Sequence, residues 1–418
     1  MQFFDLKQQY QYLKAEIDAA VLGVLEKGVF IGGEEVENFE KSMAEYLGVK
    51  HAISLNSGTD ALFLSLKALG IKEGDEVITT PFTFIATAEA IAACGAKPIF
   101  VDIDPKTFNL DPAALFIKLD SLSKLGKLGR LKAIIPVHLF GQMADMAVIM
   151  EVANKFGVKV VEDCAQSLGA EQRVSGEQRE EREGEKSENS GKSKNESKKS
   201  YLNTSKAGLP LEAKALAGTL GNIGCYSFFP TKNLGAYGDG GLVTTNDDAL
   251  YEKMKLLKSH GSSPQDKYRH LCLGVNSRLD AIQAAILNVK IKHLDEWNKK
   301  RAEIAEYYNE ALKDMDGLIA PAVNPGNTHV YHQYTIRVAR REHVQKYLKE
   351  KNIPTMIYYP TPLHLQPAFG YLGGKVGDFP EAECAAKEVL SLPMYPELDK
   401  KDQDSAIKAI KEFYGNKA

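Results

Sequence analysis

Short apolar runs alternate with helical stretches from about residue 50 to residue 246, and this alternation restricts the fold of the 418-residue chain more than any other feature. The runs rich in valine and isoleucine are predicted strands, at 51–55, 76–80, 97–103, 131–139, 158–163, 224–229 and 241–246. They are almost continuous in apolarity, as expected when helices cover both faces of a parallel sheet. The pattern predicts a three-layer α/β domain.

The pattern changes after about residue 247, where we expect two long helices and then a smaller α+β unit. The helices are predicted near 278–295 and 297–313, and within the smaller unit we expect strands at 331–338 and 355–359 and helices at 341–352, 380–390 and 402–414. The sequence thus predicts an N-terminal arm and helix (1–30), a large domain (31–250), and interdomain helices with a small C-terminal domain (251–418).

A charged insertion interrupts the large domain. Between residues 173 and 200, 15 of 28 residues are charged and Val174 is the only aliphatic one. The segment has too little apolar surface to offset the entropy lost on ordering it. We therefore predict a solvated, disordered insertion within 172–212 that loops outward. A partner-binding segment, or one that covers a neighbouring pocket, is the alternative.

Composition excludes several classes of protein. The net charge of −3 argues against a nucleic-acid binder driven by bulk charge, and no apolar run approaches the ~18 residues of a membrane span. The first residues lack the basic start and apolar core of a signal peptide. The five cysteines are far apart and lack CxxC spacing, so we expect neither a disulfide framework nor a metal site. These features predict a cytoplasmic protein.

The stretch 224–241 carries the strongest chemical signal. It places Lys232 on a short turn between two buried strands, and the glycines that follow are Gly235, Gly238, Gly240 and Gly241. Glycines allow close backbone approach to a bulky group, and partial burial would lower the pKa of the lysine and free its amine to attack a carbonyl. The alternative is a surface lysine in a flexible turn.

Two further motifs follow predicted strands. Asp163 ends the strand 158–163, where open α/β sheets bind ligands, and an acid there suits magnesium, a ribose hydroxyl or a protonated ring nitrogen. The chain has no GxGxxG and no GxxxxGK[ST], which argues against a dinucleotide or P-loop site. Ser57-Gly58-Thr59 opens a helix after the first strand, so its N–H groups and hydroxyls suit an anion, with a plain helix cap as the alternative.

The three motifs together describe one ligand. A phosphate at Thr59, a cationic nitrogen at Asp163 and a carbonyl at Lys232 are the three points of attachment of pyridoxal 5′-phosphate. Phe84, at a strand-to-helix turn, is the expected stacking partner of its ring. Phe82 competes for that role, and Phe84 packed in the core is the other alternative.

With these motifs in place, the sequence resembles the DegT/DnrJ/EryC1/StrS family of sugar aminotransferases over nearly the whole chain except 172–212. The matching segments are FIGGEEVENFE, NSGTDAL, PFTFIATAEAI, VEDCAQSLGA, SFFPTKNLGAYGDGG and LGVNSRLDAIQAAIL. The resemblance implies fold type I of the pyridoxal-phosphate transferases, like aspartate aminotransferase, with a smaller C-terminal α+β domain.

The resemblance also implies roles for individual residues. Lys232 would form the Schiff base and shuttle protons, Asp163 would pair with the pyridine nitrogen, and Gln166 would contact the ring oxygen. Phe84 would stack on the ring. The phosphate would be held by Gly58, Thr59, Ser227 and the neighbouring subunit's Asn276, which implies a homodimer with shared active sites.

The implied reaction is ping-pong transfer of an amino group from L-glutamate to a nucleotide-linked keto-sugar. Segments such as YYPTPLHLQPAF are most similar to the branch that aminates C3, with UDP-2-acetamido-3-keto-glucuronate or dTDP-3-keto-6-deoxyhexose as substrate. A sugar dehydratase of the same family is one alternative, although that branch carries His in place of Lys232. A regulatory protein that binds the cofactor without turnover is another.

Substrate contacts are expected from Arg278, Tyr331 and His364. Arg278 would pair with a carboxylate of the sugar or the amino donor through its planar fork, or else form a structural salt bridge. Tyr331 and His364 would contact the sugar or diphosphate, with ordinary packing of polar groups as the alternative.

Overall fold

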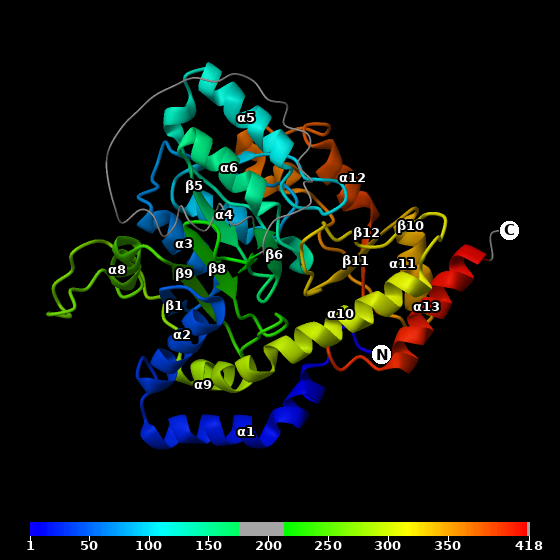
Figure 1. Ribbon diagram of the computed structural model, residues 1–418, viewed down its shortest axis with the longest axis horizontal. Coiled ribbons are helices and arrows are strands. Elements are labelled where there is room, and N and C mark those ends of the chain that lie inside the picture. The colour runs from blue at the N-terminus through cyan, green and yellow to red at the C-terminus, as the bar shows by residue number, and fades with distance from the viewer. Residues whose placement is uncertain (175–212, 416–418) are drawn as a thin grey trace.

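The computed structural model describes residues 1–174 and 213–415, and its large domain is built on one central sheet (Figure 1). The strands run in the order β1-β9-β8-β5-β4-β2-β3. Their bounds are β1 His51–Leu55, β2 Glu76–Thr79, β3 Lys97–Phe100, β4 Leu131–Ile134, β5 Lys159–Asp163, β8 Ile223–Ser227 and β9 Gly241–Thr245. Each lies within one residue of a predicted run at its start, so the predicted strands are confirmed.

The sheet is mixed, which corrects the prediction of a parallel sheet. Strand β9 pairs antiparallel with both β1 and β8, whereas the other strand pairs of this sheet are parallel. The chain between β8 and β9 contains no crossover helix, and without one a strand returns antiparallel beside its predecessor. The remaining strands, β1 included, point the same way and end at one edge of the sheet.

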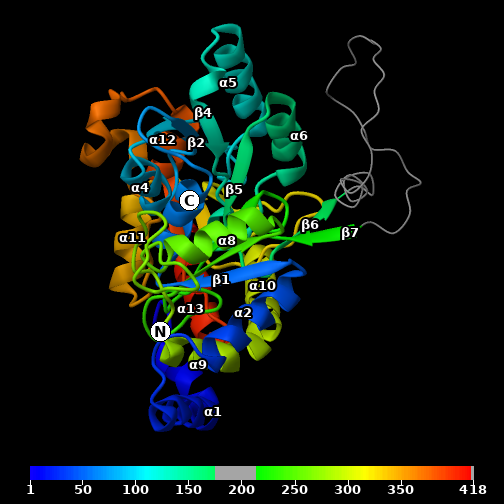
Figure 2. The same cartoon turned by 90° about the vertical axis from the view of Figure 1, so that its left-hand side faces the viewer.

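Helices cover both faces of the sheet, which confirms the three-layer prediction (Figures 1 and 2). One face packs against α3 (Gly58–Ala68), α4 (Ala86–Ala93) and α8 (Asp248–Leu257). The other packs against α2 (Glu34–Leu47), α5 (Pro112–Lys124), α6 (Met146–Phe156) and α9 (Ala281–Lys290). Neighbouring residues such as Val77 and Ile78 enter opposite cores, as strand alternation requires.

The small domain follows the long helix α10 (Leu294–Ala311). Its antiparallel sheet has the order β10-β11-β12, and its own apolar core lies between the sheet and the helices. The bounds are β10 Leu318–Ile319, β11 Tyr334–Val338, β12 Val389–Leu392, α11 Arg341–Glu350, α12 Pro380–Glu388 and α13 Lys400–Gly415. Short 3-10 turns are η1 Leu128–Arg130, η2 Leu139–Gly141, η3 Ile291–His293, η4 Leu363–Leu365 and η5 Pro367–Leu372.

One strand of the small domain was placed wrongly by the sequence. Residues 355–359 form no strand, and Met356 makes only an isolated bridge to Ser391. The strand beside β11 is β12, whose first two residues were predicted as the end of a helix at 380–390. Short apolar runs do not distinguish strand from buried helix, so tertiary pairing decided this assignment.

The N-terminal helix α1 (Leu6–Lys27) lies along α9 (Figure 1). Its Leu13 and Ile17 are buried with Ile286 and Trp297. Its other side leaves apolar side chains exposed, among them Leu22 and Leu25. No helix among residues 1–174 and 213–415 is long and apolar enough to cross a membrane.

The predicted insertion begins inside a hairpin of β6 (Glu171–Val174) and β7 (Ala213–Leu216). Residues 172–174, which we predicted as part of the disordered insertion, therefore belong to a strand. The rest of the insertion lies outside the described residues.

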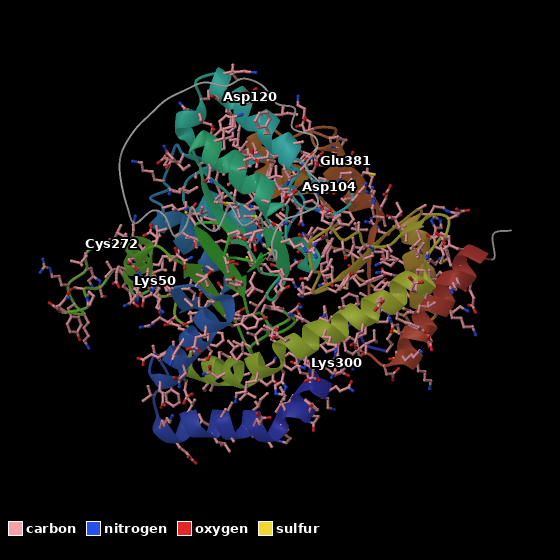
Figure 3. All side chains as sticks on the ribbon, viewed as in Figure 1. Lys50, Asp104, Asp120, Cys272, Lys300 and Glu381 are labelled. Carbon is pink, nitrogen blue, oxygen red and sulfur yellow. The ribbon has the colours of Figure 1, made fainter. Side chains whose placement is uncertain are left out.

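The two domains are joined by hydrogen bonds at the start of α12. The side chain of Asp102 in the large domain accepts hydrogen bonds from the backbone N–H groups of Glu381 and Ala382, each at 3.0 Å. Figure 3 labels Glu381, at the start of α12, and Asp104, two residues beyond Asp102. A carboxylate at a helix N-terminus satisfies free N–H groups and favours the helix dipole, so this contact holds the small domain against the sheet.

Candidate active site

The carboxyl ends of three strands bring the predicted cofactor residues to one edge of the sheet. Asp163 ends β5, Ser227 ends β8, and Gly58 opens α3 just after β1. A Cβ atom added to Gly58 would lie 2.6 Å from the Cβ of Ser227, a clash, so these two residues face each other closely. Only glycine fits at position 58, and the result is a small cradle beside a helix N-terminus.

Asp163 is buried with few hydrogen-bond donors. It is 5% exposed, and its carboxylate accepts hydrogen bonds from the Thr87 hydroxyl (2.8 Å) and the Ala165 N–H (3.1 Å). Burial raises the pKa of Asp163, while Thr87, Ala165 and the Lys232 ammonium act in the opposite direction. The site therefore holds an acid whose negative charge is incompletely compensated, which a cationic ligand group would stabilise.

Lys232 is half-buried on the turn that follows β8, where its backbone N–H donates to the Phe229 carbonyl at 2.8 Å. Burial lowers the pKa of Lys232 from 10.5 to about 8, and the Asp163 carboxylate partly opposes that shift. The lowered lysine pKa expected from the sequence is thus present. An amine with this pKa is a competent nucleophile and proton acceptor near neutral pH.

The glycines after Lys232 serve the chain's own packing. A Cβ at Gly235 would lie 2.2 Å from the Pro230 carbonyl oxygen, and a Cβ at Gly241 would lie 2.2 Å from the Ser57 carbonyl oxygen. The sequence led us to expect close approach to a bulky ligand. These two glycines instead let the loop fold back on itself and let β9 lie against the cradle.

The two phenylalanines considered as stacking partners, Phe82 and Phe84, differ in burial. Phe82 is fully buried against Phe108 and Phe140, so it belongs to the core. Phe84 is 56% exposed, which excludes core packing, and its ring lies 6.2 Å from that of Tyr359. Phe84 is therefore the phenylalanine whose face is available to a ligand.

Gln166 links Tyr359 of the small domain to the backbone of the large domain. Its Oε1 accepts a hydrogen bond from the Phe140 N–H (2.7 Å), and its Nε2 donates to the Tyr359 hydroxyl (3.2 Å). Burial raises the pKa of Tyr359, so its hydroxyl remains protonated at neutral pH. Gln166 is thus held in place by two hydrogen bonds, and its contact with the ring oxygen stays a prediction.

The predicted phosphate ligands differ in how they are placed. Thr59 follows Gly58 in the first turn of α3, where Ser57 Oγ accepts a hydrogen bond from the Asp60 N–H, as in a helix cap. Asn276 is exposed, and its neighbour Ser277 donates to the Asn56 side chain at 3.0 Å. The loop that carries Asn276 therefore touches the cradle of its own chain, and the contribution of a second subunit stays a prediction.

The three predicted substrate residues lie in different surroundings. Arg278 is half-buried and its Nε is buried with no hydrogen-bond partner. Tyr331 is buried in the small-domain core, stacked on His329 with ring centroids 3.9 Å apart. The His364 ring is buried with its Nε2 3.1 Å from Glu383. Tyr331 and His364 thus have the packing roles considered as alternatives, and their predicted substrate contacts stay predictions.

Sequence reasoning missed several residues of this site. Thr87 lies within the quoted segment PFTFIATAEAI, one helical turn beyond Phe84, so its spacing was a usable signal. Tyr359 and His332 come from the small domain and gave no such signal. His332 is buried with an unpartnered Nδ1, and burial lowers its pKa well below the usual range, with Lys232 and Arg301 lowering it further.

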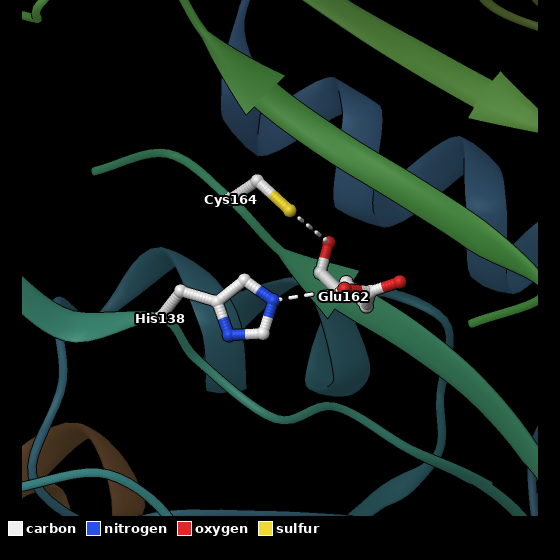
Figure 4. Close-up of side chains that lie close together, drawn as sticks. All are labelled: His138, Glu162 and Cys164. Atoms are coloured by element: carbon white, nitrogen blue, oxygen red, sulfur yellow. Dashed lines mark hydrogen bonds and ion pairs between the residues drawn. The ribbon is translucent and has the colours of Figure 1, made fainter. Parts of the chain in front are cut away.

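A hydrogen-bonded group of His138, Glu162 and Cys164 includes the residue that precedes Asp163 on β5 (Figure 4). The His138 imidazole lies 2.9 Å from Glu162, Ala144 donates to the other ring nitrogen of His138, and the Cys164 thiol donates to the Glu162 carbonyl. Although these side chains are close enough to hold a metal ion, their donor atoms are already engaged in hydrogen bonds. The group serves as a hydrogen-bonded support for β5.

Known proteins that are similar to this chain come from one family. Residues 11–411 match the model of the DegT/DnrJ/EryC1/StrS aminotransferase family. The chain is 46% identical to the pleiotropic regulatory protein of Geobacillus stearothermophilus, over 98% of this chain and 97% of that protein. It is 41% identical to the UDP-2-acetamido-2-deoxy-3-oxo-D-glucuronate aminotransferase of Pseudomonas aeruginosa, over 96% of each chain. The crystal structure of NtdA from Bacillus subtilis with bound cofactor PMP superposes with a TM-score of 0.81 at 28% identity, covering 99% of this chain and 85% of that one.

The strand-end cradle, the buried acid and the lysine of lowered pKa all follow strands of the central sheet, and the comparisons identify the chain as an aminotransferase. The chain belongs to the DegT/DnrJ/EryC1/StrS aminotransferase family. Its cofactor is pyridoxal 5′-phosphate. The residues present fit that group, because the Gly58–Ser227 cradle suits its phosphate and the undercompensated Asp163 suits its cationic ring nitrogen.

Proposed function

We propose that this protein transfers the amino group of L-glutamate to C3 of a nucleotide-linked keto-sugar, releasing 2-oxoglutarate. The observation that carries the proposal is the pairing of Lys232 with Asp163, a nucleophilic amine coupled electrostatically to a buried acid at the edge of the sheet. Each group alone is common, but together they supply an attachment point and a charge for one ring.

The chemistry is then divided among the chain's own residues. Bound pyridoxal 5′-phosphate supplies a carbonyl and a ring that withdraws electrons from the carbon losing its proton. Lys232 would hold the cofactor through Nζ and, once released, would carry a proton between the substrate carbon and the cofactor in each half of the reaction. With a pKa of about 8, its amine is neutral in about half of the molecules near pH 8, so it can accept that proton.

The other site residues bind and orient. The Asp163 carboxylate stabilises a positive charge on the ring nitrogen. That positive charge in turn compensates the buried negative charge of Asp163. Gly58, Thr59 and Ser227 hold the phosphate at the N-terminus of α3, where the helix dipole favours an anion. Phe84 covers one face of the ring, and Gln166 is fixed to contact its oxygen.

The proposed substrate is a C3-keto-sugar of the UDP-2-acetamido-glucuronate type. The Pseudomonas aeruginosa relative is named for such a sugar and is 41% identical to this chain. The buried Nε of Arg278 has no hydrogen-bond partner, and a carboxylate of the sugar or of glutamate would satisfy it. A dTDP-3-keto-6-deoxyhexose lacks that carboxylate and is the alternative substrate.

A panel of UDP- and dTDP-linked 3-keto and 4-keto sugars, offered with L-glutamate, tests this proposal. We expect release of 2-oxoglutarate with UDP-linked 3-keto sugars and none with Lys232→Ala. Lys253→Met is the matched control, because Lys253 donates to the Ala68 carbonyl away from the strand ends. Turnover only with 4-keto sugars would overturn the C3 assignment.

A regulatory role without turnover is the second candidate, because the Geobacillus stearothermophilus relative is named a pleiotropic regulatory protein. L-glutamate alone decides between the two candidates. An aminotransferase transfers the amino group to its cofactor, so the yellow protein bleaches and 2-oxoglutarate appears in an amount equal to the sites. A passive binder or a dehydratase keeps its colour.

We also propose that the protein works as a cytoplasmic homodimer in which Asn276 of one subunit reaches the phosphate of the other. The loop before Asn276 exposes Tyr268, Leu271 and Leu273, the last 97% exposed. Exposed apolar residues gathered on one loop favour burial against a partner. Cys272, exposed on the same loop and labelled in Figure 3, is therefore expected to react slowly with a bulky maleimide in the dimer and faster on dilution to monomer.

A further inference from the structure

Lys290 is buried in α9 and bonded to the loop that carries Lys232. It is 1% exposed, and its Nζ donates to the carbonyl oxygen of Gly235 at 2.5 Å. Its ammonium also lies over two aromatic rings, 4.9 Å from the Tyr237 centroid and 5.8 Å from that of Trp297. This is the geometry of a cation held between a carbonyl and two aromatic faces.

The bonded carbonyl belongs to a tightly closed loop. The N–H of Lys232 donates to the Phe229 carbonyl and that of Ala236 donates to the Phe228 carbonyl, both at 2.8 Å. Gly235 lies so close to Pro230 that no side chain fits there. A loop closed this tightly moves as a unit, so a bond at Gly235 also restrains the turn on which Lys232 lies.

A lysine in this position is costly to the fold. Burial lowers the pKa of Lys290 from 10.5 to about 7, and only the charge of Glu397 acts in the opposite direction. A methionine of similar length would fill the same space without that cost. Ionisable groups with strongly shifted pKa values are concentrated at functional sites. The hydrogen bond of Lys290 is to Gly235, on the loop that carries Lys232.

We propose that Lys290 is a positioning residue for the reaction: by holding the Gly235 carbonyl, it fixes the loop that presents the Lys232 amine to the cofactor. The inference rests on the proposed role of Lys232 as the cofactor lysine. It assigns Lys290 no contact with substrate. Its effect passes through the backbone of residues 232–235 and should appear as order in that loop.

The test is Lys290→Met, which keeps an unbranched apolar stem and removes the terminal donor. Hydrogen exchange is measured on the full-length chain with and without cofactor. We expect the Lys232 and Ala236 amides to exchange about tenfold faster and the Kd for pyridoxal 5′-phosphate to rise about tenfold. The melting temperature should stay the same or rise, because a buried ionisable group is removed. We also expect kcat to fall with the KM for the keto-sugar unchanged.

Matched variants separate this role from a general effect of losing a lysine. Lys290→Arg restores a cationic donor and should return exchange and affinity to within about threefold of the parent. Lys253→Met removes another lysine–carbonyl bond and should change neither. If Lys290→Met does not fold, Lys290→Gln replaces it, since its amide is one atom too short to reach Gly235 and keeps a polar group in the space.

Unchanged loop exchange and cofactor affinity in Lys290→Met would overturn the inference, as would an equal change in Lys253→Met. Neither readout requires turnover of a sugar. Failure of the proposed function would appear separately, as a parent protein that binds the cofactor but releases no 2-oxoglutarate.

Discussion

The two sides of strand β5 carry adjacent acids in opposite states. Glu162 faces the inner core and accepts hydrogen bonds from His138 and from the backbone N–H groups of Gly218, Leu220 and Gly221. Burial acts to raise its pKa, but the His138 bond and charge and these N–H donors outweigh burial and lower it. Asp163 has two donors, and its pKa is raised.

The difference separates an acid whose charge is used by the fold from an acid whose charge we propose is used by the cofactor. Glu162 is fully compensated and joins the turn after β7 to the sheet, so its charge is already used by the fold. Asp163 is left with unsatisfied charge, so a cationic ligand group improves its environment. Both acids are buried on one strand, and the number of donors, rather than burial, distinguishes them.

The largest effect is expected from replacing Lys232, whose positive charge acts on Asp163. Lys232→Ala should lower turnover by more than about 10³-fold, because one residue both attaches the cofactor and moves the proton. Borohydride reduction of the cofactor-loaded parent followed by peptide mass mapping should mark Lys232, with Lys253→Met treated in parallel. A labelled lysine elsewhere would contradict the assignment.

Asp163→Asn should lower kcat by about 10²-fold while leaving the cofactor-free fold at least as stable. A carboxyl whose folded pKa is raised destabilises the native state above that pKa, so an amide should maintain or raise the melting temperature at pH 7. Calorimetry of the cofactor-free protein and steady-state rates give the two readouts. A marked loss of stability would show that Asp163 is structural, like Glu162.

Glu162→Gln should have the opposite pattern: the fold should lose stability while kcat changes little. Removing the charge leaves His138 and several N–H groups poorly paired, at a cost of about 3 kcal/mol in the free energy of unfolding. Because the pKa of Glu162 is lowered, this difference should be full above about pH 4.5, the ordinary value for glutamate, and shrink as pH falls through the folded pKa. Denaturant unfolding measures it, and kcat per folded molecule should stay within about threefold.

The smallest effect is a pH dependence of cofactor capture. Since the pKa of Lys232 is lowered to about 8, the neutral amine falls about tenfold per pH unit below that value. The rate at which cofactor-free protein gains the yellow absorbance should therefore rise up to about pH 8 and then level off. In Asp163→Asn, which removes the charge that raises the lysine pKa, the levelling point should move to lower pH.

The sequence was sufficient for the strands of the large domain, and the residues that it predicts for the cofactor follow the ends of those strands. Their signals are local: β1 ends just before Ser57-Gly58-Thr59, and Asp163 ends β5, so strand ends and motifs coincide. The mixed direction of β9 and the pairing of β12 with β11 depend on contacts between distant segments. Periodicity over a short run does not contain that information.

The sequence alone determined the set of candidate reactive groups. The lysine, the acid and the small-residue turn each lie in a short local motif that follows a predicted strand. Only the tertiary structure decided that the pKa values of Glu162 and Asp163 shift in opposite directions, that Tyr359 reaches Gln166, and that Lys290 bonds to the Gly235 carbonyl. Charge state and orientation are set by donors and burial, which come from partners far along the chain.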